Sequence, residues 1–370
     1  MSFNEWKKYS LSDVAEIKYG KDHKHLGIGS IPVYGSGGVM RYADTALYDK
    51  ESILIPRKGT LGNLFYIDIP FWSVDTIFYT KIKENVNAKF LFYLLKTLNL
   101  ASMNVGSAVP SLTTEILNKV EITLPPLKTQ QRIASILSSL DDKIELNRQT
   151  NQTLEAMAQT LFKEMCFPLR DEIPDRWKIG RFKDVATQVK ENIKPSKFSQ
   201  KLFHHYSLPA FDNGEVPSYD LSETILSNKT AVRKYSVLFS KLNPRIPRIW
   251  SIGDVDELVS ICSTEFIGFV PKKDFQYSYI NFFLKDNDTI KKLASHATGT
   301  SNSHQRIKPE GILNLELIIP TEKILKDFDE IVRPFLEMRF KNIQQNQTLV
   351  AIRNTLLPKL MNQDFNIEAL

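Results

Sequence analysis

The chain has 370 residues, of which 42% are hydrophobic and 24% are charged, a composition typical of a folded protein with two domains or more. The two cysteines, Cys166 and Cys262, are too few for a disulfide framework and too isolated for a zinc site. The best apolar run, at 312–319, is interrupted by Glu316, and residues 1–10 lack the apolar core of a signal peptide, so we expect a cytoplasmic protein without membrane contact or structural metal.

The net charge of +6 is modest, but many basic residues lie in windows of sequence that contain no acidic residue. Two of these windows, 224–253 and 289–309, fall in the second half of the chain, and two others, 52–67 and 85–114, fall in the first. Basic residues without neighbouring carboxylates suit contact with phosphates. Chance would also produce a single window of this kind, but four windows favour a polyanionic partner.

Residues 1–125 are predicted to form a first globular unit of the α+β class. Short runs rich in β-branched and aromatic residues predict strands at 52–56 and 76–82, and 88–98 predicts a helix. Glycine, proline and asparagine between these runs predict turns. The YGSGG sequence at 34–38 fits neither a Rossmann turn nor a Walker loop, and we interpret it as a turn that lets the chain approach a polyanionic partner closely.

The segment 126–165 is predicted to be a long helix that pairs with another helix. Residues at alternating steps of four and three form an apolar seam with asparagine in the middle, which is the a/d pattern of a coiled coil. The seam residues are Ile133, Leu137, Leu140, Ile144, Asn147, Asn151, Leu154, Ala158, Leu161 and Met165. A proline-containing linker is expected at 166–174.

The rest of the chain repeats this order. Two pairs of segments are similar: WKKYSLSDVA (6–15) with WKIGRFKDVA (177–186), and ILNKVEITLP (116–125) with ILNLELIIP (312–320). We therefore predict a second globular unit at 175–320, a second long helix at 321–361 and a tail at 362–370. Strand-like runs at 236–239 and 266–270 place the second unit in the same α+β class.

The two long helices align at an offset of 195, which superimposes their two NQTL sequences. Asparagine in a seam costs stability but fixes register and partner, because a slipped pairing would bury its amide without a hydrogen bond. In an antiparallel pair the numbers of facing residues would add up to about 493, so Asn147 is expected to face Asn346, and Asn151 to face Asn342. Two amphipathic helices packed on their own domains are the alternative.

Two features of the second helix complicate this seam. Arg339 and Arg353 occupy seam positions, where neighbouring apolar residues are expected to supply the contact: Ile331, Met338 and Ile352. Pro334 is expected to kink or break the start of the helix, at a cost of about 3 kcal/mol.

The helical segments resemble a known family. LPPLKTQQRIASILSSLDDKIELNRQTNQTLEAMAQTLFKEM (124–165) and FDEIVRPFLEMRFKNIQQNQTLVAIRNTLLPKLM (328–361) resemble the two conserved regions of specificity subunits of type I restriction-modification systems. In the globular units, IPVYGSGGV, ILIPRKGTLGN and GSAVPSL resemble first target-recognition domains, and SKLNPRIPRIW and STEFIGF resemble second ones.

The resemblance implies two similar target-recognition domains separated by an antiparallel coiled coil. Each domain would read one half of a bipartite, asymmetric site in double-stranded DNA, while the helices set the spacer and bind two methyltransferase subunits. Two motor-nuclease subunits would complete the complex. The chain would be non-catalytic and hold no cofactor, and its partners would bring S-adenosylmethionine, ATP and Mg²⁺ for adenine-N6 methylation and cleavage. A related methyltransferase or phage-defence complex without a restriction motor is the alternative.

Candidate DNA-binding residues lie in polar or basic turns of both units. Those in the first unit are Ser36, Arg57, Lys58, Thr60, Asn63 and Ser107. Those in the second are Lys241, Asn243, Arg245, Arg248, Thr300, Ser301, Asn302, Ser303, His304 and Arg306. Arginine and lysine suit phosphates and guanine edges, and the polar TGTSNSHQR sequence has side-chain types that read base edges. A plain solvated loop would have the same composition.

No catalytic constellation is predicted. Asn243-Pro244-Arg245 departs from the Asn-Pro-Pro-aromatic loop of an adenine methyltransferase, because arginine stands where proline belongs. Two other classes stay open. An enzyme with an unfamiliar active site would methylate DNA alone when given S-adenosylmethionine, and a scaffold protein that binds no DNA would give no salt-sensitive DNA shift in its complex.

Overall fold

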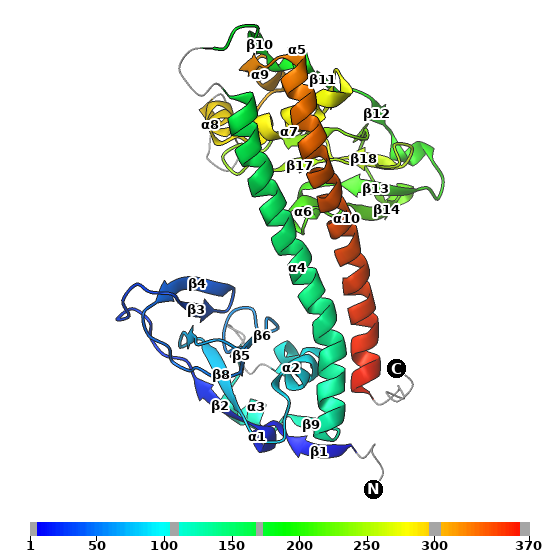
Figure 1. Ribbon diagram of the computed structural model, residues 1–370. Coiled ribbons are helices and arrows are strands. Elements are labelled where there is room, and N and C mark those ends of the chain that lie inside the picture. The colour runs from blue at the N-terminus through cyan, green and yellow to red at the C-terminus, as the bar shows by residue number, and fades with distance from the viewer. Residues whose placement is uncertain (1–5, 104–110, 168–172, 296–304, 363–370) are drawn as a thin grey trace. The chain divides into compact units, whose positions relative to one another are not determined.

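The computed structural model describes residues 6–103, 111–167, 173–295 and 305–362. The chain falls into two compact units, one formed by Met1–Ile144 with Thr348–Leu370 and the other by Glu145–Gln347. Each unit contains a β-rich domain and part of both long helices, α4 (Leu127–Cys166) and α10 (Glu322–Met361) (Figure 1).

The first unit contains three small sheets. An antiparallel pair joins β1 (Lys7–Ser10) to β9 (Glu121–Leu124). A four-stranded sheet has the order β2 (Ala15–Tyr19), β8 (Ile77–Ile82), β5 (Ser52–Pro56), β6 (Phe65–Ile67). A three-stranded sheet has the order β4 (Gly38–Ala43), β3 (Ile31–Gly35), β7 (Trp72–Ser73). The helical segments are α1 (Leu11–Val14), α2 (Ala88–Thr97), η1 (Leu100–Met103) and α3 (Thr114–Asn118).

The second unit also contains three sheets. β10 (Lys178–Arg181) pairs with β20 (Glu316–Ile319). A four-stranded sheet has the order β11 (Ala186–Gln188), β19 (Phe266–Pro271), β16 (Val237–Ser240), β17 (Ile249–Ser251). A five-stranded sheet has the order β12 (Asn192–Ile193), β15 (Lys229–Ala231), β18 (Ser260–Cys262), β13 (Leu202–Tyr206), β14 (Ser218–Leu221).

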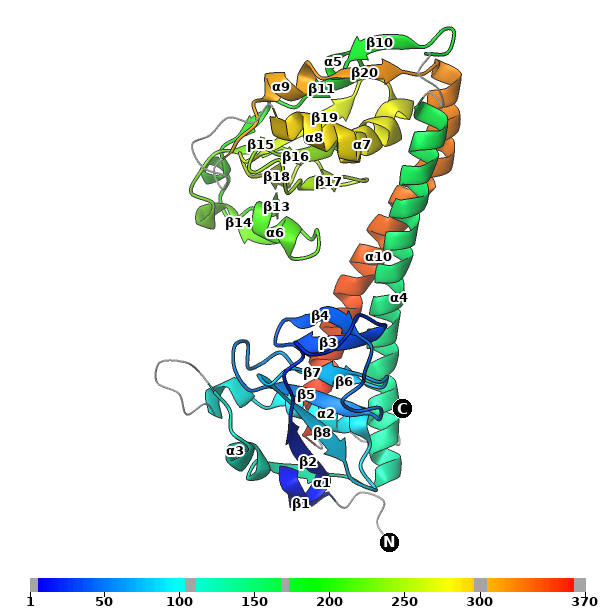
Figure 2. The same ribbon diagram turned by 90° about the vertical axis from the view of Figure 1, so that its left-hand side faces the viewer.

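The helical segments of the second unit are short apart from α4 and α10. They are α5 (Phe182–Val185), η2 (Pro195–Lys197), α6 (Leu208–Asp212), η3 (Ser222–Thr224), η4 (Asp274–Gln276), α7 (Tyr277–Lys285), α8 (Asn287–Ser295) and α9 (Pro309–Leu313). Helix α7 packs on the four-stranded sheet (Figure 2), and nearly all of its side chains are buried.

The two units share a strand order that extends beyond the repeated ends found in the sequence. The sheet β2-β8-β5-β6 corresponds in order and pairing to β11-β19-β16-β17. The three-stranded sheet β4-β3-β7, here called the inner sheet, corresponds to strands β14-β13-β18 of the second unit. In both, the middle strand is parallel to the last one, β3 to β7 and β13 to β18. The second unit then adds β15 and β12 at one edge. The parts of the units that lie between the repeated ends therefore share a three-stranded core.

Each domain is attached to the helices through its own buried core. In the first unit, Ile133 and Leu137 of α4 lie in the cluster that contains Phe78 and Phe90. In the second unit, Phe162 of α4 is fully buried, and its ring centroid lies 5.7 to 6.5 Å from those of three aromatic rings: Tyr279, Phe282 and Phe328. The apolar halves of the predicted seam are therefore shared between the helix pair and the domains.

Helices α4 and α10 pack antiparallel, as the repeat predicted (Figure 1). Asn147 Nδ2 donates to Asn346 Oδ1 at 2.8 Å and also to Gln345 Oε1 at 2.8 Å. Asn342 Nδ2 donates to Asn151 Oδ1 at 2.8 Å. Both expected asparagine pairs are therefore present. Together with the sheets of the two units, the helix pair confirms the predicted α+β class with two β-rich regions and paired long helices.

The arginines of the seam are accommodated by carboxylates and not by the neighbouring apolar residues. Arg339 Nη2 donates to Glu215 Oε1 at 2.6 Å, and Arg353 Nη1 donates to Asp141 Oδ1 at 2.5 Å. The residues expected to fill these positions are turned outward, with 43%, 50% and 42% of their surface exposed: Ile331, Met338 and Ile352. Pairing with a carboxylate satisfies the guanidinium, which a methionine or isoleucine cannot do.

The expectation that Pro334 would break the helix is also wrong. Helix α10 continues through this residue without interruption from Glu322 to Met361. Pro334 lies on the exposed side of the helix. A proline there removes one backbone hydrogen bond, but the freed carbonyl can bind water, so the helix need not end.

Replacement of Asn147 by leucine is expected to lower the free energy of unfolding by about 2 kcal/mol, because it leaves the Asn346 amide without this partner in a position where Asn147 is only 2% exposed. Replacement of both Asn147 and Asn346 by leucine should recover most of this loss of stability. Urea unfolding of the two single variants and the double variant measures the coupling. Additive losses would show that the asparagines contribute independently.

Candidate nucleic-acid interface

The predicted DNA-contacting residues of the first unit come together in two turns. The loop between β5 and β6 carries Arg57, Lys58, Thr60 and Asn63, and the turn between β3 and β4 carries Ser36. Asn63 Nδ2 donates to Ser36 O at 2.9 Å. Gly59 has a φ of +83°, and a Cβ there would lie 2.9 Å from Ser36 Oγ. Glycine is thus required for the close approach of the two turns.

A third segment crosses the base of this loop. Lys58 forms an antiparallel bridge with Ser111, and Leu112 N donates to Arg57 O at 3.0 Å. The Arg57 guanidinium lies 5.3 Å from the centroid of the Tyr19 ring, which holds it beside the loop. Lys58 and Thr60 are exposed, and Lys58 has no ion pair among the described residues. The candidate Ser107 lies outside the described residues.

The second unit has the same arrangement at the equivalent place. Its basic loop, 241–248, connects β16 to β17, as the first loop connects β5 to β6. Leu242 forms an antiparallel bridge with Arg306, Asn243 N donates to Gln305 O at 2.8 Å, and Ile307 N donates to Lys241 O at 3.0 Å. Five further candidates lie outside the described residues: Thr300, Ser301, Asn302, Ser303 and His304.

Asn243 has a φ of +49°, in the left-handed region that asparagine tolerates better than most residues. This conformation turns the chain before Pro244 and leaves Arg245 exposed. Among the described residues Arg245 has no ion pair. It is therefore the member of this loop best placed to contact a phosphate.

The windows that lack acidic residues in the sequence do not lack them in space. Arg248 donates from Nε and Nη2 to the two oxygens of Asp212, at 2.7 and 2.9 Å. This contact holds the pKa of Asp212 below its usual value. Arg306 pairs with Glu265 at 2.9 Å, and Lys241 Nζ donates to Thr264 O at 2.6 Å. The inference from acid-free windows therefore overestimated how many cations are unpaired.

The carboxylates that bind these arginines and those of the helices were not singled out from the sequence. Two of them could have been found from the predicted register of the helix pair. In that register Leu140 faces Arg353 and Leu154 faces Arg339, and the next residues in the sequence are the carboxylates Asp141 and Glu155. For Asp212, Glu215 and Glu265 no signal exists, because they lie in segments without periodicity.

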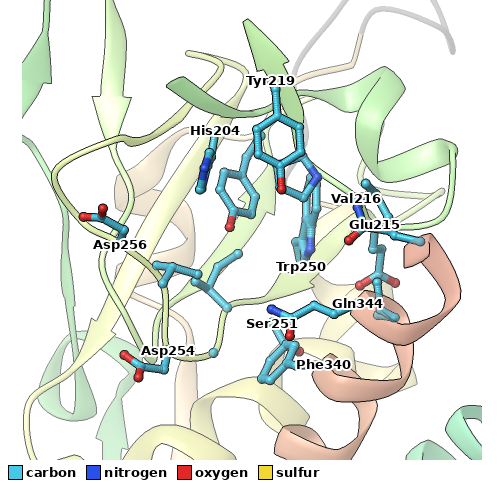
Figure 3. A pocket seen from close by; sticks show the side chains of 17 residues that line it. His204, Glu215, Val216, Tyr219, Trp250, Ser251, Asp254, Asp256, Phe340 and Gln344 are labelled. Carbon is cyan, nitrogen blue, oxygen red and sulfur yellow. The ribbon is translucent and has the colours of Figure 1, made fainter. Parts of the chain in front are cut away.

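A pocket of about 250 Å³ opens between the strands of the second unit and α10 (Figure 3). Its walls combine aromatic rings with carboxyl groups: Tyr206, Tyr219, Trp250, Phe340, Glu215, Asp254 and Asp256. Carboxylates repel phosphates, so Asp254 and Asp256 make this pocket a poor place for contact with a DNA backbone.

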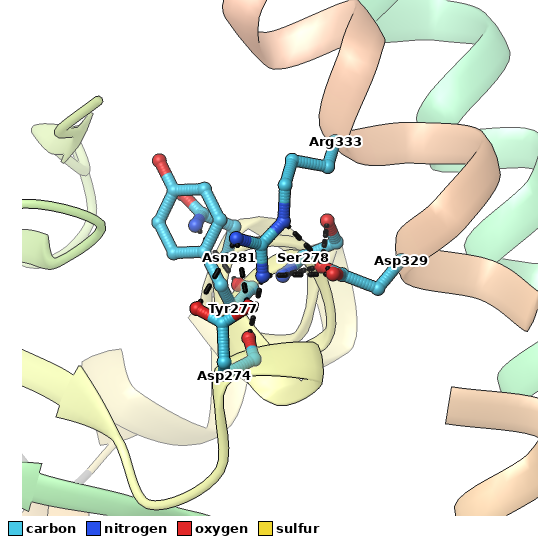
Figure 4. Close-up of polar contacts among 6 residues, drawn as sticks. All are labelled: Asp274, Tyr277, Ser278, Asn281, Asp329 and Arg333. Carbon is cyan, nitrogen blue, oxygen red and sulfur yellow. Dashed lines mark hydrogen bonds and ion pairs between the residues drawn. The ribbon is translucent and has the colours of Figure 1, made fainter. Parts of the chain in front are cut away.

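Polar contacts fix the second domain on α10 (Figure 4). Ser278 donates to Asp329 Oδ1 from its backbone N at 3.1 Å and from Oγ at 2.6 Å. Arg333 Nε donates to Asp329 Oδ2 at 2.9 Å, and its Nη1 donates to Asp274 Oδ1 at 3.2 Å. The guanidinium also lies 5.6 Å from the centroid of the Tyr277 ring. One helical turn of α10 thus binds the start of α7.

The described residues form neither of two kinds of reactive site, a metal centre or an activated thiol. They have no group of three or more histidine, cysteine or acidic residues able to hold a metal ion. Both thiols are buried, and burial raises the pKa of Cys262 to about 12. A thiol with such a pKa stays protonated and is a poor nucleophile. Among the described helices, none combines the length and apolar character needed to cross a bilayer.

Comparison with known proteins agrees with this geometry. Residues 4–156 match the family described as the type I restriction modification DNA specificity domain. The MjaIX specificity subunit of a type I restriction enzyme from Methanocaldococcus jannaschii is 25% identical over 431 aligned positions, which cover 99% of this chain and 95% of that protein. A Mycoplasma pneumoniae protein, described as the C-terminus of a type I specificity subunit, is 32% identical over 101 positions that cover 27% of this chain and 68% of that protein.

The fold has a counterpart among solved structures. The crystal structure of a type I restriction-modification S subunit from M. genitalium superimposes with a TM-score of 0.67 at 14% identity, covering 98% of this chain and 97% of that one. The same α+β architecture is thus reached by a sequence that has diverged widely. The chain therefore belongs to the type I restriction-modification specificity subunits, the non-catalytic subunits through which these complexes recognise their DNA target.

Proposed function

We propose that each of the two units reads one half of a bipartite site in double-stranded DNA. The observation that carries this proposal is that both units have the same strand order and the same loop arrangement. In each unit a basic loop follows the equivalent strand, β5 or β16, and a second segment of the chain crosses the base of that loop. Two similar surfaces with exposed cations, Lys58 in one unit and Arg245 in the other, suit two separate contacts with one duplex.

The two half-sites are expected to differ. The first loop reads PRKGTLGN and the second SKLNPRIP, so both contain arginine, lysine and asparagine, but at different positions along the loop. Their supports differ too, since a short turn at Ser36 adjoins the first loop whereas α6 adjoins the second through Asp212. Phosphate contacts alone would not distinguish sequences, so the differing side chains support an asymmetric target.

The helix pair is proposed to fix the spacer between the half-sites and to bind the methyltransferase subunits. The asparagine pairs hold α4 and α10 in one register, and a shift of register would move the domains along the helices. In the second unit, the helices also expose apolar side chains that a partner could cover: Leu146, Met157, Ile331 and Met338.

The chain is part of a type I restriction-modification complex, and its composition is proposed to be two methyltransferase and two motor-nuclease subunits with one specificity subunit. The methyltransferase subunits would supply S-adenosylmethionine and the motor-nuclease subunits ATP and Mg²⁺. Mapping of methylated adenines in a genome that carries this gene with its methyltransferase partner tests the proposal. A single motif of two unlike halves separated by a fixed number of unspecified bases is expected, and a continuous motif would contradict it.

Replacement of Arg245 by alanine is expected to weaken DNA binding of the methyltransferase complex and to reduce its salt dependence. The plot of log K against log salt has a negative slope, and the loss of one phosphate contact makes this slope shallower by roughly one unit. Titrations at several salt concentrations measure this slope. Arg233→Ala is the matched control, because Arg233 of the second unit is already paired with Glu191 and Glu257. An unchanged slope for Arg245→Ala would remove this residue from the interface.

The sequence makes Arg245 and Arg248 equal candidates for contact with a phosphate, but their surroundings differ. Arg248 is held by Asp212 on α6, so alanine at this position would release α6 as well as remove a charge. A joint Arg245→Ala, Arg248→Ala variant is expected to bind more weakly than Arg245→Ala alone. The same titrations separate the two contributions.

A further inference from the structure

Four charged side chains of the second unit form a cluster that joins both long helices to the recognition domain. Arg339 of α10 donates to Glu215 Oε1 at 2.6 Å, and its Nε lies 3.8 Å from Glu155 Oε2 on α4. Lys285, at the end of α7, donates to the other oxygen of Glu155 at 2.7 Å. The side chains of Arg339 and Lys285 are only 14% and 13% exposed, so this Arg339 cluster is largely shielded from water.

Glu155 and Arg339 of this cluster are held in their charged forms despite their burial. Burial acts to raise the pKa of Glu155, but Lys285 and Arg339 outweigh it and hold this pKa below its usual value. Burial acts to lower the pKa of Arg339, but Glu215 and Glu155 outweigh it and raise this pKa. Charges in such surroundings are costly to separate, because removal of one leaves its partner buried and unpaired.

The backbone at Glu215 is held in an unusual conformation. Gly214 has a φ of +97°, and Glu215 follows with a φ of +61°. The left-handed region is uncommon for a residue with a side chain, and such a conformation persists where surrounding contacts hold it. Here the contacts are the hydrogen bond from Glu215 N to Phe211 O, at 3.0 Å, and the hydrogen bond from Arg339, which also fixes the turn between α6 and β14 against α10.

The same turn also holds the basic loop. Asp212 stands three residues before Glu215 and accepts both hydrogen bonds of Arg248, at 2.7 and 2.9 Å. One short segment, residues 212–215, therefore binds the basic loop through one carboxylate and α10 through the other.

A pocket of about 610 Å³ that opens to solvent lies on this side of the loop, and its lining includes Pro247 of the basic loop, Phe211 of α6 and the members of the Arg339 cluster. Apolar side chains therefore do not close the gap between the basic loop and the helices here. The Arg248–Asp212 and Arg339–Glu215 contacts bridge it through segment 212–215.

We infer that segment 212–215 is a positioning element. Through Arg248 and Arg339 it fixes the position of the second basic loop along the axis of the helix pair. In the complex this position determines the spacer length at which the second half-site can be read. The inference rests on the proposed function of the chain. Glu215 and Arg339 are positioning residues that touch no DNA, and their role is to restrict the spacer.

The test uses the full chain in complex with its methyltransferase subunits and a set of duplexes that keep both half-sites but vary the spacer one base pair at a time. The wild type should methylate one spacer strongly. Arg339→Leu and Glu215→Gln are expected to lower the preference for that spacer over its neighbours by about tenfold, while both half-site sequences remain necessary. Arg233→Leu, which breaks an arginine pair of the second unit away from the helices, should keep the wild-type preference.

Exchange of the two charges, in a Glu215→Arg, Arg339→Glu variant that also carries Glu155→Gln so that no two carboxylates face each other, separates positioning from misfolding. Recovery of a single preferred spacer in this variant supports the inference, even where both single variants lose all activity. Failure of the exchange to recover it, or unchanged preference in both single variants, overturns the inference. A wild type that methylates all spacers equally would instead contradict the proposed function itself, so the two failures can be told apart.

Discussion

Exchange of residues 1–125 for the corresponding part of another specificity subunit is expected to change one half of the recognised DNA sequence and to leave the other half unchanged. The first unit has its own sheets and its own buried clusters, in which Phe78, Phe90 and Trp72 take part. Its basic loop contacts only segments of the same unit among the described residues. Maps of methylated adenines before and after the exchange measure the result.

The reciprocal exchange of residues 175–320 is the control, and it should change the other half alone. The junctions matter, because Ile133 and Leu137 of α4 belong to the core of the first domain and must fit the incoming one. A mismatch there would leave a cavity and cost about 2–5 kcal/mol for each large side chain lost. A change of both halves, or of neither, would show that the units do not read DNA independently.

The helix pair was the part of the fold most accessible from sequence. Heptad spacing states which residues of a helix share a face, and buried asparagines leave few acceptable registers, so the pairs Asn147–Asn346 and Asn151–Asn342 followed from numbering alone. The same logic failed at Arg339, since its partner Glu215 lies on a turn outside both helices. Periodicity carries no information about such a partner.

The inner sheets, in contrast, could not be predicted from the sequence. Strands β3 and β13 occupy the same place in the two units, but their sequences, IPVYG and LFHHY, have little in common. Sheets are held by backbone hydrogen bonds that every residue except proline can donate, and strands of four or five residues leave a weak alternation signal. The shared order β4-β3-β7 and β14-β13-β18 could therefore be recognised only from the pairing itself.

The grouping of the candidate residues in the first unit was only partly visible in the sequence. Ser36 belongs to one motif, and Arg57, Lys58 and Asn63 belong to another. The structure places the two motifs in adjoining turns, while a role of these residues in DNA binding stays a prediction. Charge was harder to judge than position. A window without acidic residues describes neighbours along the chain, whereas the field at Arg248 is set by Asp212, which is 36 residues away in sequence and 2.7 Å away in space.

Replacement of Asp329 by alanine is expected to lower the free energy of unfolding of the second unit by about 3 kcal/mol. Asp329 is 6% exposed and binds two different groups with its two oxygens. One oxygen accepts the backbone N–H of Ser278 in the first turn of α7, where N–H groups have no partner within the helix, and the other accepts from Arg333. Thermal or urea unfolding of the full chain measures the loss.

Two matched variants divide this loss between its causes. Asp329→Asn can keep an acceptor for Ser278 but removes the charge that faces Arg333, so its cost should be smaller than that of alanine. Ser278→Ala removes the Oγ donor while the backbone contact remains, and about 1 kcal/mol is expected. If all three variants unfolded like the wild type, Asp329 would not hold α7 on α10. If asparagine cost as much as alanine, the ion pair with Arg333 would dominate, because a neutral acceptor would then have preserved nothing of the attachment.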